Sequence, residues 1–261
     1  MDAPVRSDAA WRSMPKSPAL ARLGVIFLLF AIWEIGVRLF GDPLFFSPPS
    51  RVVAALVVIL GTKPILVAFA TTFWELVAAF LLSVAIGLPV GLVLGLHPFS
   101  RRAFYPMILL LYALPLATIL PLVVLAFGIG PASKIAFGVG HGAFPIIVSV
   151  VAGVQNIKPS LIAAARSMGA SRRQILLSVV LPHAVPSFFT GIRLATAAVL
   201  LGVLLAELYV SQAGVGYFTS QFTDAFEPSK LFAIIGVLAA IAVMLNALCG
   251  WAERYFTRWH V

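Results

Sequence analysis

Charge is scarce in this chain of 261 residues: only 10% of them are Asp, Glu, Lys or Arg, whereas 61% are hydrophobic. So much apolar surface cannot be hidden inside a water-facing globule of this length, which excludes the soluble protein classes. Four long intervals hold no charged residue, and they lie between positions 75 and 101, 102 and 134, 134 and 158, and 230 and 253. Because about 20 apolar residues cross a bilayer as a helix, each interval predicts at least one membrane span.

The residues of common active sites are also missing. The one cysteine, Cys249, can form no internal disulfide and is expected to pack in the last apolar run. The histidines are too far apart in sequence to suggest a catalytic triad or a metal site, at His97, His141, His183 and His260. None of the five lysines follows a glycine, so the Gly-Lys-Ser/Thr ending of a phosphate-binding P-loop is absent. We therefore expect no enzyme activity, no metal and no cofactor in this chain.

The net charge of +9 is distributed unevenly. In a six-helix arrangement most cations fall on one side of the membrane, namely Arg6, Arg12, Lys16, Arg22, Arg101, Arg102, Lys158, Arg166, Arg172, Arg173, Arg254 and Arg258. The opposite side holds Arg38, Arg51, Lys63, Lys134 and Lys230, with Arg193 near a helix start. The positive-inside rule places the first group, and both termini, in the cytoplasm. A nucleic-acid partner is not expected, because no base-reading or stacking groups accompany the cations.

The predicted fold class is an all-α integral membrane protein with six spans. Their approximate ranges are 20–40, 68–96, part of 105–127, 135–154, 187–208 and 231–251. Residues 1–19 form a cytoplasmic tail in this scheme, and 20–261 form one transmembrane domain. The apolar segment 52–60 is too short to cross and is expected to lie on the membrane surface.

Small residues recur every four positions in the second expected span, at Ala79, Ser83, Gly87, Gly91 and Gly95. This spacing puts them on one face of the helix, where another helix can approach closely. The stripe is therefore predicted to be a helix-packing face.

The third expected span follows a turn at 97–102 and contains Pro106, Pro115 and Pro121. Proline has no N–H to donate, so each is expected to interrupt the helix and to free backbone carbonyls. These carbonyls either line a water-filled route or mark a packing kink, and the sequence leaves both readings open.

Ionisable side chains at membrane depth are costly and so are functional candidates. Glu207 lies about 30 Å along a helix from Ser187, so we expect it near the outer mouth. His141 lies deeper, and is expected either to make an interhelical hydrogen bond or to line a route. Glu34 and Glu75 are assigned to helix packing or to anchoring.

The segment 156–182 is polar enough to leave the membrane, and it is predicted to form two short helices joined at a glycine. Pro159 suits a first helical turn, and Gly169 suits the left-handed residue that ends a helix. Ser171 and Gln174 have the spacing of a capping box for the second helix.

Pro182 is expected to end that second helix. The cations Lys158, Arg166, Arg172 and Arg173 all fall in this hairpin, which places it in the cytoplasm. The segment is therefore predicted to be a docking element and not a span.

The hairpin carries a family resemblance. The pattern Glu-Ala-Ala, three residues, Gly, nine residues, Ile-x-Leu-Pro is typical of the permease subunits of ABC importers. This sequence matches it at Ala164, Ala165, Gly169, Leu181 and Pro182, with Val179 in the isoleucine position and Ala163 in place of the glutamate. Further phrases resemble the nitrate, sulfonate and taurine type, at 46–50, 120–121, 127–130, 190–194, 206–208 and 214–216. The resemblance covers roughly the last 190 residues and implies the type I permease fold, with the hairpin between the fourth and fifth spans.

The resemblance also implies partners and site residues. The hairpin would seat in a groove of a separate ATPase subunit through Ala163, Ala164, Ala165, Arg166, Ser167, Met168, Gly169, Ala170 and Ser171. Two ATPase subunits would bind ATP and Mg, a second permease copy would complete a homodimer, and a periplasmic or lipid-anchored binding protein would deliver the solute. The assembly would lie in the lipid of a bacterial cytoplasmic (inner) membrane. Helices near the third span, with Pro115 and Pro121, would line the route. The shared phrase Ala206-Glu207-Leu208 implies that Glu207 is either a gate residue near the outer side or a structural anchor there.

The implied solute is small, by family default an anion such as nitrate, a sulfonate or taurine. A thiamine-precursor, riboflavin-like or aromatic-acid solute is an alternative, because the spans do not distinguish between them. A secondary transporter or channel that works without ATP would share the spans and the prolines, but it would not explain the helix-glycine-helix hairpin that ends in Leu-Pro. The inverted repeats typical of secondary carriers are not visible either.

Overall fold

The computed structural model describes residues 18–256, and every regular element within this range is a helix. The elements are α1 (Pro18–Phe40), α2 (Pro49–Leu60), α3 (Lys63–Leu96), α4 (Pro98–Ala113), the 3₁₀-helix η2 (Leu116–Ile119), α5 (Leu120–Phe127), α6 (Pro131–Gln155), α7 (Pro159–Ser167), α8 (Arg172–Ile175), the π-helix η3 (Leu176–Val180), α9 (Leu181–Val210), α10 (Val215–Asp224) and α11 (Pro228–Phe256). Of the expected N-terminal tail only residues 18 and 19 are described, and Arg6, Arg12, Lys16, Arg258 and His260 lie outside the described residues.

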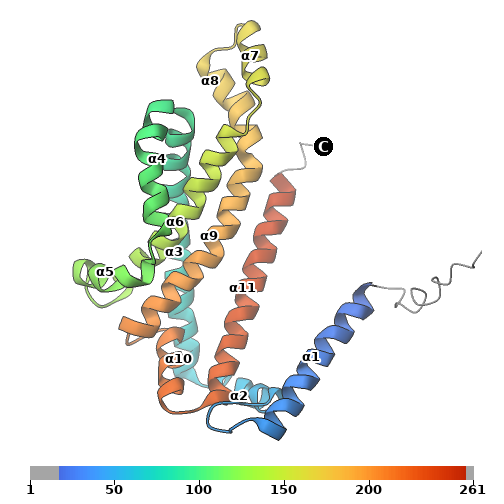
Figure 1. The fold of residues 1–261 in the computed structure, drawn as a ribbon. Helices are drawn as coiled ribbons and strands as arrows, with labels where there is room; N and C mark the ends of the chain where they lie inside the picture. The colour runs from blue at the N-terminus through green and yellow to red at the C-terminus, as the bar shows by residue number, and fades with distance from the viewer. Residues whose placement is uncertain (1–17, 257–261) are drawn as a thin grey trace, which may run out of the picture.

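The helices form an elongated bundle with two distinct ends (Figure 1). Helices α7 and α8 project from one end, which is called the hairpin end below. Helices α2 and α10 lie at the opposite end, which is called the loop end.

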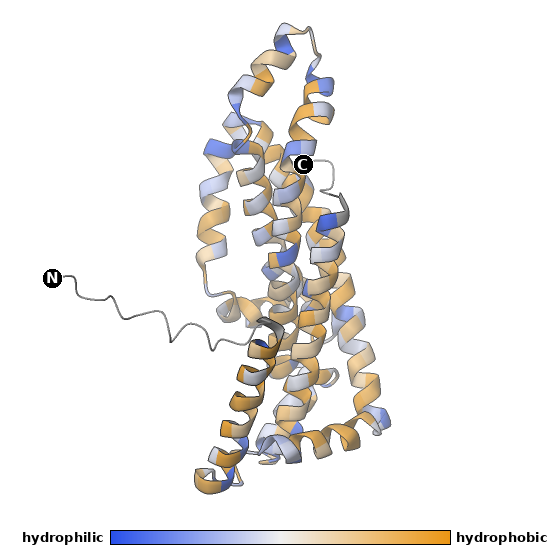
Figure 2. Ribbon diagram, turned by 90° about the vertical axis from the view of Figure 1, so that its right-hand side faces the viewer, coloured by the Kyte–Doolittle hydropathy of each residue, from blue (hydrophilic) through white to orange (hydrophobic). Residues whose placement is uncertain are grey.

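Five helical stretches of the described chain are long and apolar enough to cross a membrane, at Leu20–Phe40, Lys63–Leu96, Pro131–Gln155, Arg172–Val210 and Pro228–Arg254. Helix α4 together with η2 and α5 has the length and apolar composition of a sixth span, and it is bent by 88° at a break. Apolar residues predominate along the length of these helices (Figure 2). The predicted all-α membrane fold is thereby confirmed, with five or six candidate spans, and the short apolar α2 lies at the loop end without crossing the bundle.

Helices α3, α6 and α9 make the closest contacts in the bundle. The small residues of the predicted stripe are all buried on α3, and they face α6. A Cβ atom added to Gly91 would lie 2.7 Å from the Cβ atom of Val150, so no larger residue fits there. Equivalent contacts join Gly87 to Ile146 and Gly95 to Val154.

Nearer the loop end, the glycines of this contact lie on α6 and no longer on α3. Gly138 and Gly142 of α6 now face Ala79 and Ser83 of α3, and a Cβ atom on Gly142 would also overlap Val199 of α9. Helix α6 is thus held between α3 and α9 by contacts in which a glycine of one helix receives a side chain of the other. Small residues allow helix backbones to approach in this way inside a membrane.

The third span departs from its prediction. The expected turn at 97–102 is present but shorter than predicted: His97 is the single extended residue between α3 and α4, and α4 begins immediately after it. Pro106 lies inside a continuous α4 and does not interrupt it. The chain breaks instead at Pro115, before η2, while Pro121 lies in the first turn of α5. A proline fits the first turn because the N–H that it lacks would have no helical partner there.

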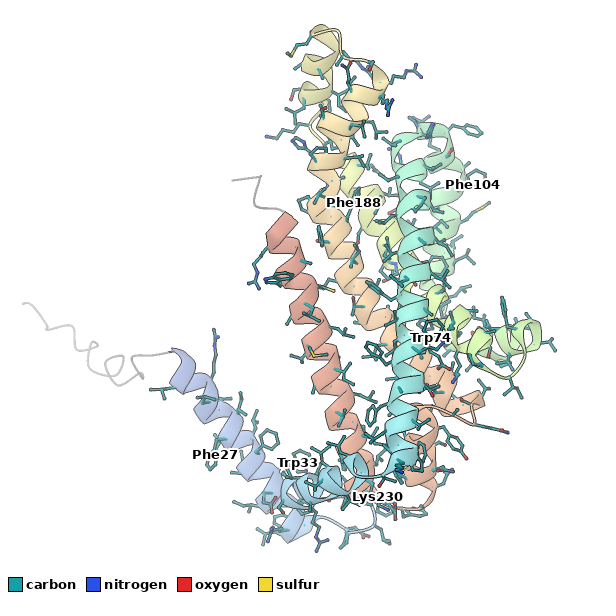
Figure 3. The ribbon with its side chains drawn as sticks, turned by 180° about the vertical axis from the view of Figure 1, so that it is seen from behind. Phe27, Trp33, Trp74, Phe104, Phe188 and Lys230 are labelled. Carbon is teal, nitrogen blue, oxygen red and sulfur yellow. The ribbon has the colours of Figure 1, made fainter. Side chains whose placement is uncertain are left out.

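Helix α1 is attached to the bundle near its C-terminal end. Glu34 accepts hydrogen bonds from the backbone N–H (3.0 Å) and the hydroxyl (2.8 Å) of Ser50, in the first turn of α2. Trp33 packs edge-on against Phe232 of α11, with ring centroids 5.7 Å apart. The rest of α1 leans away from the other helices, and Phe27 is 76% exposed (Figure 3). Glu34 therefore anchors α1 to the N-terminus of α2, where a carboxylate is favoured.

Replacing Gly142 with alanine is expected to destabilise the bundle, because the added methyl group would overlap Val199 and Ser83. Overpacking of this kind costs about 1–3 kcal/mol. Gly140 on the same helix has no atom within 4 Å of its Cβ position, so Gly140→Ala is a matched control that should leave stability unchanged or slightly higher. Thermal unfolding of the purified protein in detergent measures both variants. Equal midpoints for the two would contradict the close contact of α6 with its neighbours.

Candidate functional site

A Schellman motif closes the first helix of the hairpin. Gly169 has a φ angle of 76°, and its N–H donates to the carbonyl of Arg166 at 2.9 Å. The N–H of Ala170 donates to the carbonyl of Ala165 at 3.0 Å. Glycine suits this left-handed position because it has no Cβ atom to clash. The left-handed stop predicted from the sequence is present.

A capping box opens the second helix. The Ser171 hydroxyl accepts from the backbone N–H of Gln174 at 3.3 Å, and the Gln174 side chain accepts from the N–H of Ser171 at 2.8 Å. Pro159 lies in the first turn of α7. Both features are as the sequence predicts, and together they fix the directions of α7 and α8.

One face of the hairpin packs against the bundle, and the other face is exposed. Ile157, Ile175 and Val180 are buried beneath it and join the hairpin to the bundle. Among the predicted coupling residues, Ala165 and Ala170 pack against this small core, whereas Ala163, Ala164, Arg166, Ser167, Met168, Gly169 and Ser171 are exposed. Met168, at the tip, is 86% exposed. A large apolar side chain held out on a fixed turn is suited to insertion into a partner protein.

The second helix does not end at Pro182, contrary to prediction. Helices α8, η3 and α9 form one uninterrupted stretch over Arg172–Val210. Pro182 lies in the first turn of α9, immediately after the π-helix. The wider π-turn shifts the hydrogen-bond pattern just before the residue that has no N–H to donate, so the helix continues across it. The fifth span therefore begins earlier than expected and is continuous with the hairpin.

At the loop end, charged side chains from the three central helices meet in the interior. The side chains of Glu75 on α3, Lys134 on α6 and Glu207 on α9 are 0%, 3% and 0% exposed. The Lys134 Nζ atom lies 2.5 Å from Oε1 of Glu75 and 3.8 Å from Oε1 of Glu207. The two carboxylates therefore share this one ammonium group. Buried charges are tolerated when paired, so Lys134 is what permits Glu75 to be buried.

Glu207 is held by hydrogen bonds at the start of α10. The Thr72 hydroxyl donates to Glu207 at 2.7 Å, and the Gly216 N–H donates to the same carboxylate at 2.8 Å. The Val215 N–H donates to the Thr72 hydroxyl at 2.8 Å. The N-cap residue of α10 is Gly214, which has no side chain of its own to accept these bonds. Thr72 and Glu207 therefore cap α10 from two other helices, where the helix dipole favours a carboxylate.

Lys134 corrects an expectation. The sequence places it among the surface cations of the outer side, yet it is 2% exposed and also donates to the carbonyl of Ala213 at 3.2 Å. Reasoning from the sequence alone misses Lys134 and Thr72 as site residues. A signal exists for the lysine, because it is the sole charge between positions 102 and 158, and a lone cation in apolar surroundings requires a nearby anion.

The other predicted route residues lie apart from this cluster. Nδ1 of His141 is 3.0 Å from the carbonyl oxygen of Phe137 on its own helix, and the ring packs against Gly202 of α9. The expected interhelical hydrogen bond of His141 is therefore not observed. Pro115 and Pro121 are exposed at the break between α4 and α5. Within residues 18–256, no group of three or more His, Cys, Asp or Glu side chains is placed to hold a metal ion.

Comparison with known proteins identifies relatives over most of the chain. The sequence profile of the family described as binding-protein-dependent transport system inner membrane component matches residues 87–259. The chain is 32% identical to the taurine transport system permease protein TauC of Escherichia coli (strain K12), over 96% of this chain and 93% of that protein. It is 28% identical to the formylaminopyrimidine transport permease protein ThiX of Halalkalibacterium halodurans, over 87% and 94% of the two chains. The crystal structure of a bacterial alginate ABC transporter, in complex with an alginate-bound periplasmic protein, has the same fold in one chain, with a TM-score of 0.67 at 13% identity over 96% of this chain and 99% of that chain.

Replacing Lys134 with methionine is expected to destabilise the protein strongly, because Glu75 and Glu207 would remain buried without a cation. Breaking a buried pair in this way costs about 3–5 kcal/mol. The double variant Glu75→Gln/Lys134→Met removes both charges and should recover much of that loss. Thermal unfolding of Lys134→Met, Glu75→Gln and the double variant, each compared with the parent protein, completes a double-mutant cycle. Losses that simply add in the double variant would contradict the pairing.

Proposed function

Because this chain belongs to the family of binding-protein-dependent transport system inner membrane components, and is the permease subunit of an ABC importer, we propose that its two ends bind different partner proteins. The hairpin end receives the ATPase subunits, and the loop end receives the loaded binding protein. One observation carries this proposal: a single continuous helical stretch, Arg172–Val210, joins the exposed hairpin to the buried cluster around Glu207. Movement imposed on the hairpin would reach the opposite end through this stretch.

The hairpin would dock into the ATPase through Met168 and the exposed residues beside it. Its Schellman turn and capping box fix the geometry of the tip, so little order has to be gained on binding. The ATPase partners would bind ATP and Mg, because this sequence has no P-loop. Since each permease offers one hairpin, two ATPase subunits require two permease copies, most simply a homodimer.

The hairpin and both termini would face the cytoplasm. The hairpin end carries a dense group of cations, at Arg101, Arg102, Lys158, Arg166, Arg172 and Arg173. An excess of Lys and Arg marks the cytoplasmic side of a membrane protein. The loop end would then face the binding protein in the periplasm.

The solute would pass beside the broken span, along a face shared with the second copy. The break at Pro115 interrupts a membrane span, and discontinuous spans line the solute routes of many transporters. Apolar side chains of α5 next to the break are exposed on this chain alone, with Leu125 at 84%. A second permease copy would cover this face.

Glu207 would act as an anchor whose movement opens or closes the outer side. Its carboxylate ties the end of α9 to the first turn of α10. When α9 moves, α10 would move with it, so the loop end would respond to the hairpin. The cluster would therefore serve the gate without touching the solute.

The solute would be a small sulfonate such as taurine. The support is the 32% identity to the taurine permease across nearly the whole chain. The formylaminopyrimidine permease is similar at 28%, so a thiamine-precursor solute enters the test as the second candidate.

The proposal is tested with the complex of this permease, its ATPase and its binding protein, reconstituted in lipid. ATP hydrolysis is measured with taurine, an alkanesulfonate, nitrate, a formylaminopyrimidine or riboflavin presented on the binding protein. We expect taurine or the alkanesulfonate to stimulate hydrolysis, because the loaded binding protein acts through the loop end and α9. Uptake by vesicles that lack ATP, with no ATPase copurifying, would contradict the proposal and indicate a secondary carrier.

Variants at the hairpin tip provide the control for this assay. Met168→Asp places a charge on the apolar contact and should abolish the solute-stimulated hydrolysis, whereas Met168→Leu keeps an apolar side chain of similar size and should retain it. Both variants should insert and unfold like the parent protein, because Met168 makes no packing contribution to the bundle. Normal uptake with Met168→Asp would refute docking through this tip.

A further inference from the structure

A cavity at the hairpin end is used by none of the steps above. It has a volume of about 410 Å³ and lies between the start of α4, the end of α6 and α7. Arg101, Gln155, Ala163 and Arg166 contribute to its wall. The cavity therefore adjoins the exposed face of the hairpin and is lined by two arginines from separate helices, Arg101 of α4 and Arg166 of α7.

No carboxylate lines this cavity. The sequence has no Asp or Glu anywhere over residues 76–206, and Glu253 near the end of α11 pairs with Arg193. Within the part of the chain that the structure describes, neither Arg101 nor Arg166 makes an ion pair, and the same holds for Arg102, Lys158, Arg172 and Arg173. The hairpin end thus presents cations for which residues 18–256 supply no anion.

The chemistry of the wall selects the type of ligand. Two cations beside one cavity repel each other and are stabilised by an anion between them. Guanidinium groups bind carboxylates through paired N–H donors with a fixed planar geometry. Ala163 contributes only a methyl group, so this wall leaves room for a carboxylate that enters from outside.

We propose that the cavity receives an aspartate or glutamate side chain of the ATPase subunit. In this contact the permease supplies the cations, Arg101 and Arg166, and the ATPase supplies the anion. The inference rests on the proposed function, because it takes the hairpin as the ATPase docking site. It adds the sign of the charge that the docking groove must carry.

The position of α7 favours a protein over a lipid headgroup as the source of the carboxylate. Helix α7 projects past the ends of α4 and α11, away from the apolar length of the bundle (Figure 1). Arg166 lies on α7, two residues before the exposed tip at Met168. An ATPase that contacts Met168 would therefore meet the cavity at the same interface.

The test installs a carboxylate in the cavity from the permease itself. The full-length permease is held in discs of neutral phosphatidylcholine, and binding of the purified ATPase is measured at low and high salt. We expect Ala163→Glu to weaken ATPase binding by about tenfold or more, because the new carboxylate occupies Arg101 and Arg166 and repels the incoming one. Ala163→Gln has the same size without the charge, so any effect of added bulk at the interface is common to both variants, and the difference of about tenfold is expected between Ala163→Glu and Ala163→Gln. The salt dependence of binding should also become shallower in Ala163→Glu.

The remaining possible results contradict the inference, and each does so in a different way. Binding by Ala163→Glu that equals or exceeds binding by Ala163→Gln would show that the cavity does not take a carboxylate of the partner. A loss that appears only in discs containing anionic lipid would assign the cavity to a headgroup. A parent permease that fails to bind the ATPase at all would instead refute the proposed function. Equal unfolding midpoints of the two variants exclude misfolding as the cause of a difference.

Discussion

The close approach of α6 to α3 and α9 is the constraint on which the rest of the structure depends. Apolar helices gain little by leaving lipid for one another, so they associate by dispersion contacts between backbones that small residues bring together. Gly91 and Gly142 are points where no larger side chain fits. Because the three helices are this close, Glu75, Lys134 and Glu207 can meet across them and exclude lipid and water.

Charge is treated in opposite ways at the two ends of the bundle. At the loop end the chain satisfies its own buried charges, with Lys134 beside Glu75 and with Thr72 and the N-terminus of α10 around Glu207. At the hairpin end the cations have no anionic partner within the described residues. Charges that are paired within the chain hold the loop end in a fixed shape, as a gate requires. Cations without an anionic partner at the hairpin end can bind a partner protein that supplies anions. The continuous helix over Arg172–Val210 connects the two.

The sequence predicts features that depend on neighbouring residues more accurately than features that depend on distant ones. The turn at Gly169 and the capping box at Ser171 follow from local backbone chemistry, and both are present. The expected end at Pro182 was wrong, because a π-turn accommodates the missing donor, and no local rule for proline anticipates that. The burial of Lys134 depends on partners 59 and 73 positions away in the sequence, so its local pattern resembles that of a surface cation. The chain breaks at Pro115 but continues through Pro106, which lies well inside α4, so the presence of a proline alone does not predict where the break falls.

If the hairpin and α9 move as one rigid unit, a distance measured along that unit stays constant through the transport cycle. Spin labels at positions 173 and 201 lie on either side of η3, roughly 40 Å apart at the rise of an α-helix. Labelled chains with Cys249 replaced by serine are diluted with unlabelled chains in the complete complex, and the distance distribution is recorded with and without bound ATP. Our account predicts the same distribution in both states, while labels at position 168 of the two permease copies move relative to each other. A distribution between 173 and 201 that changes with ATP would show bending at η3, and would contradict transmission of hairpin movement along α9.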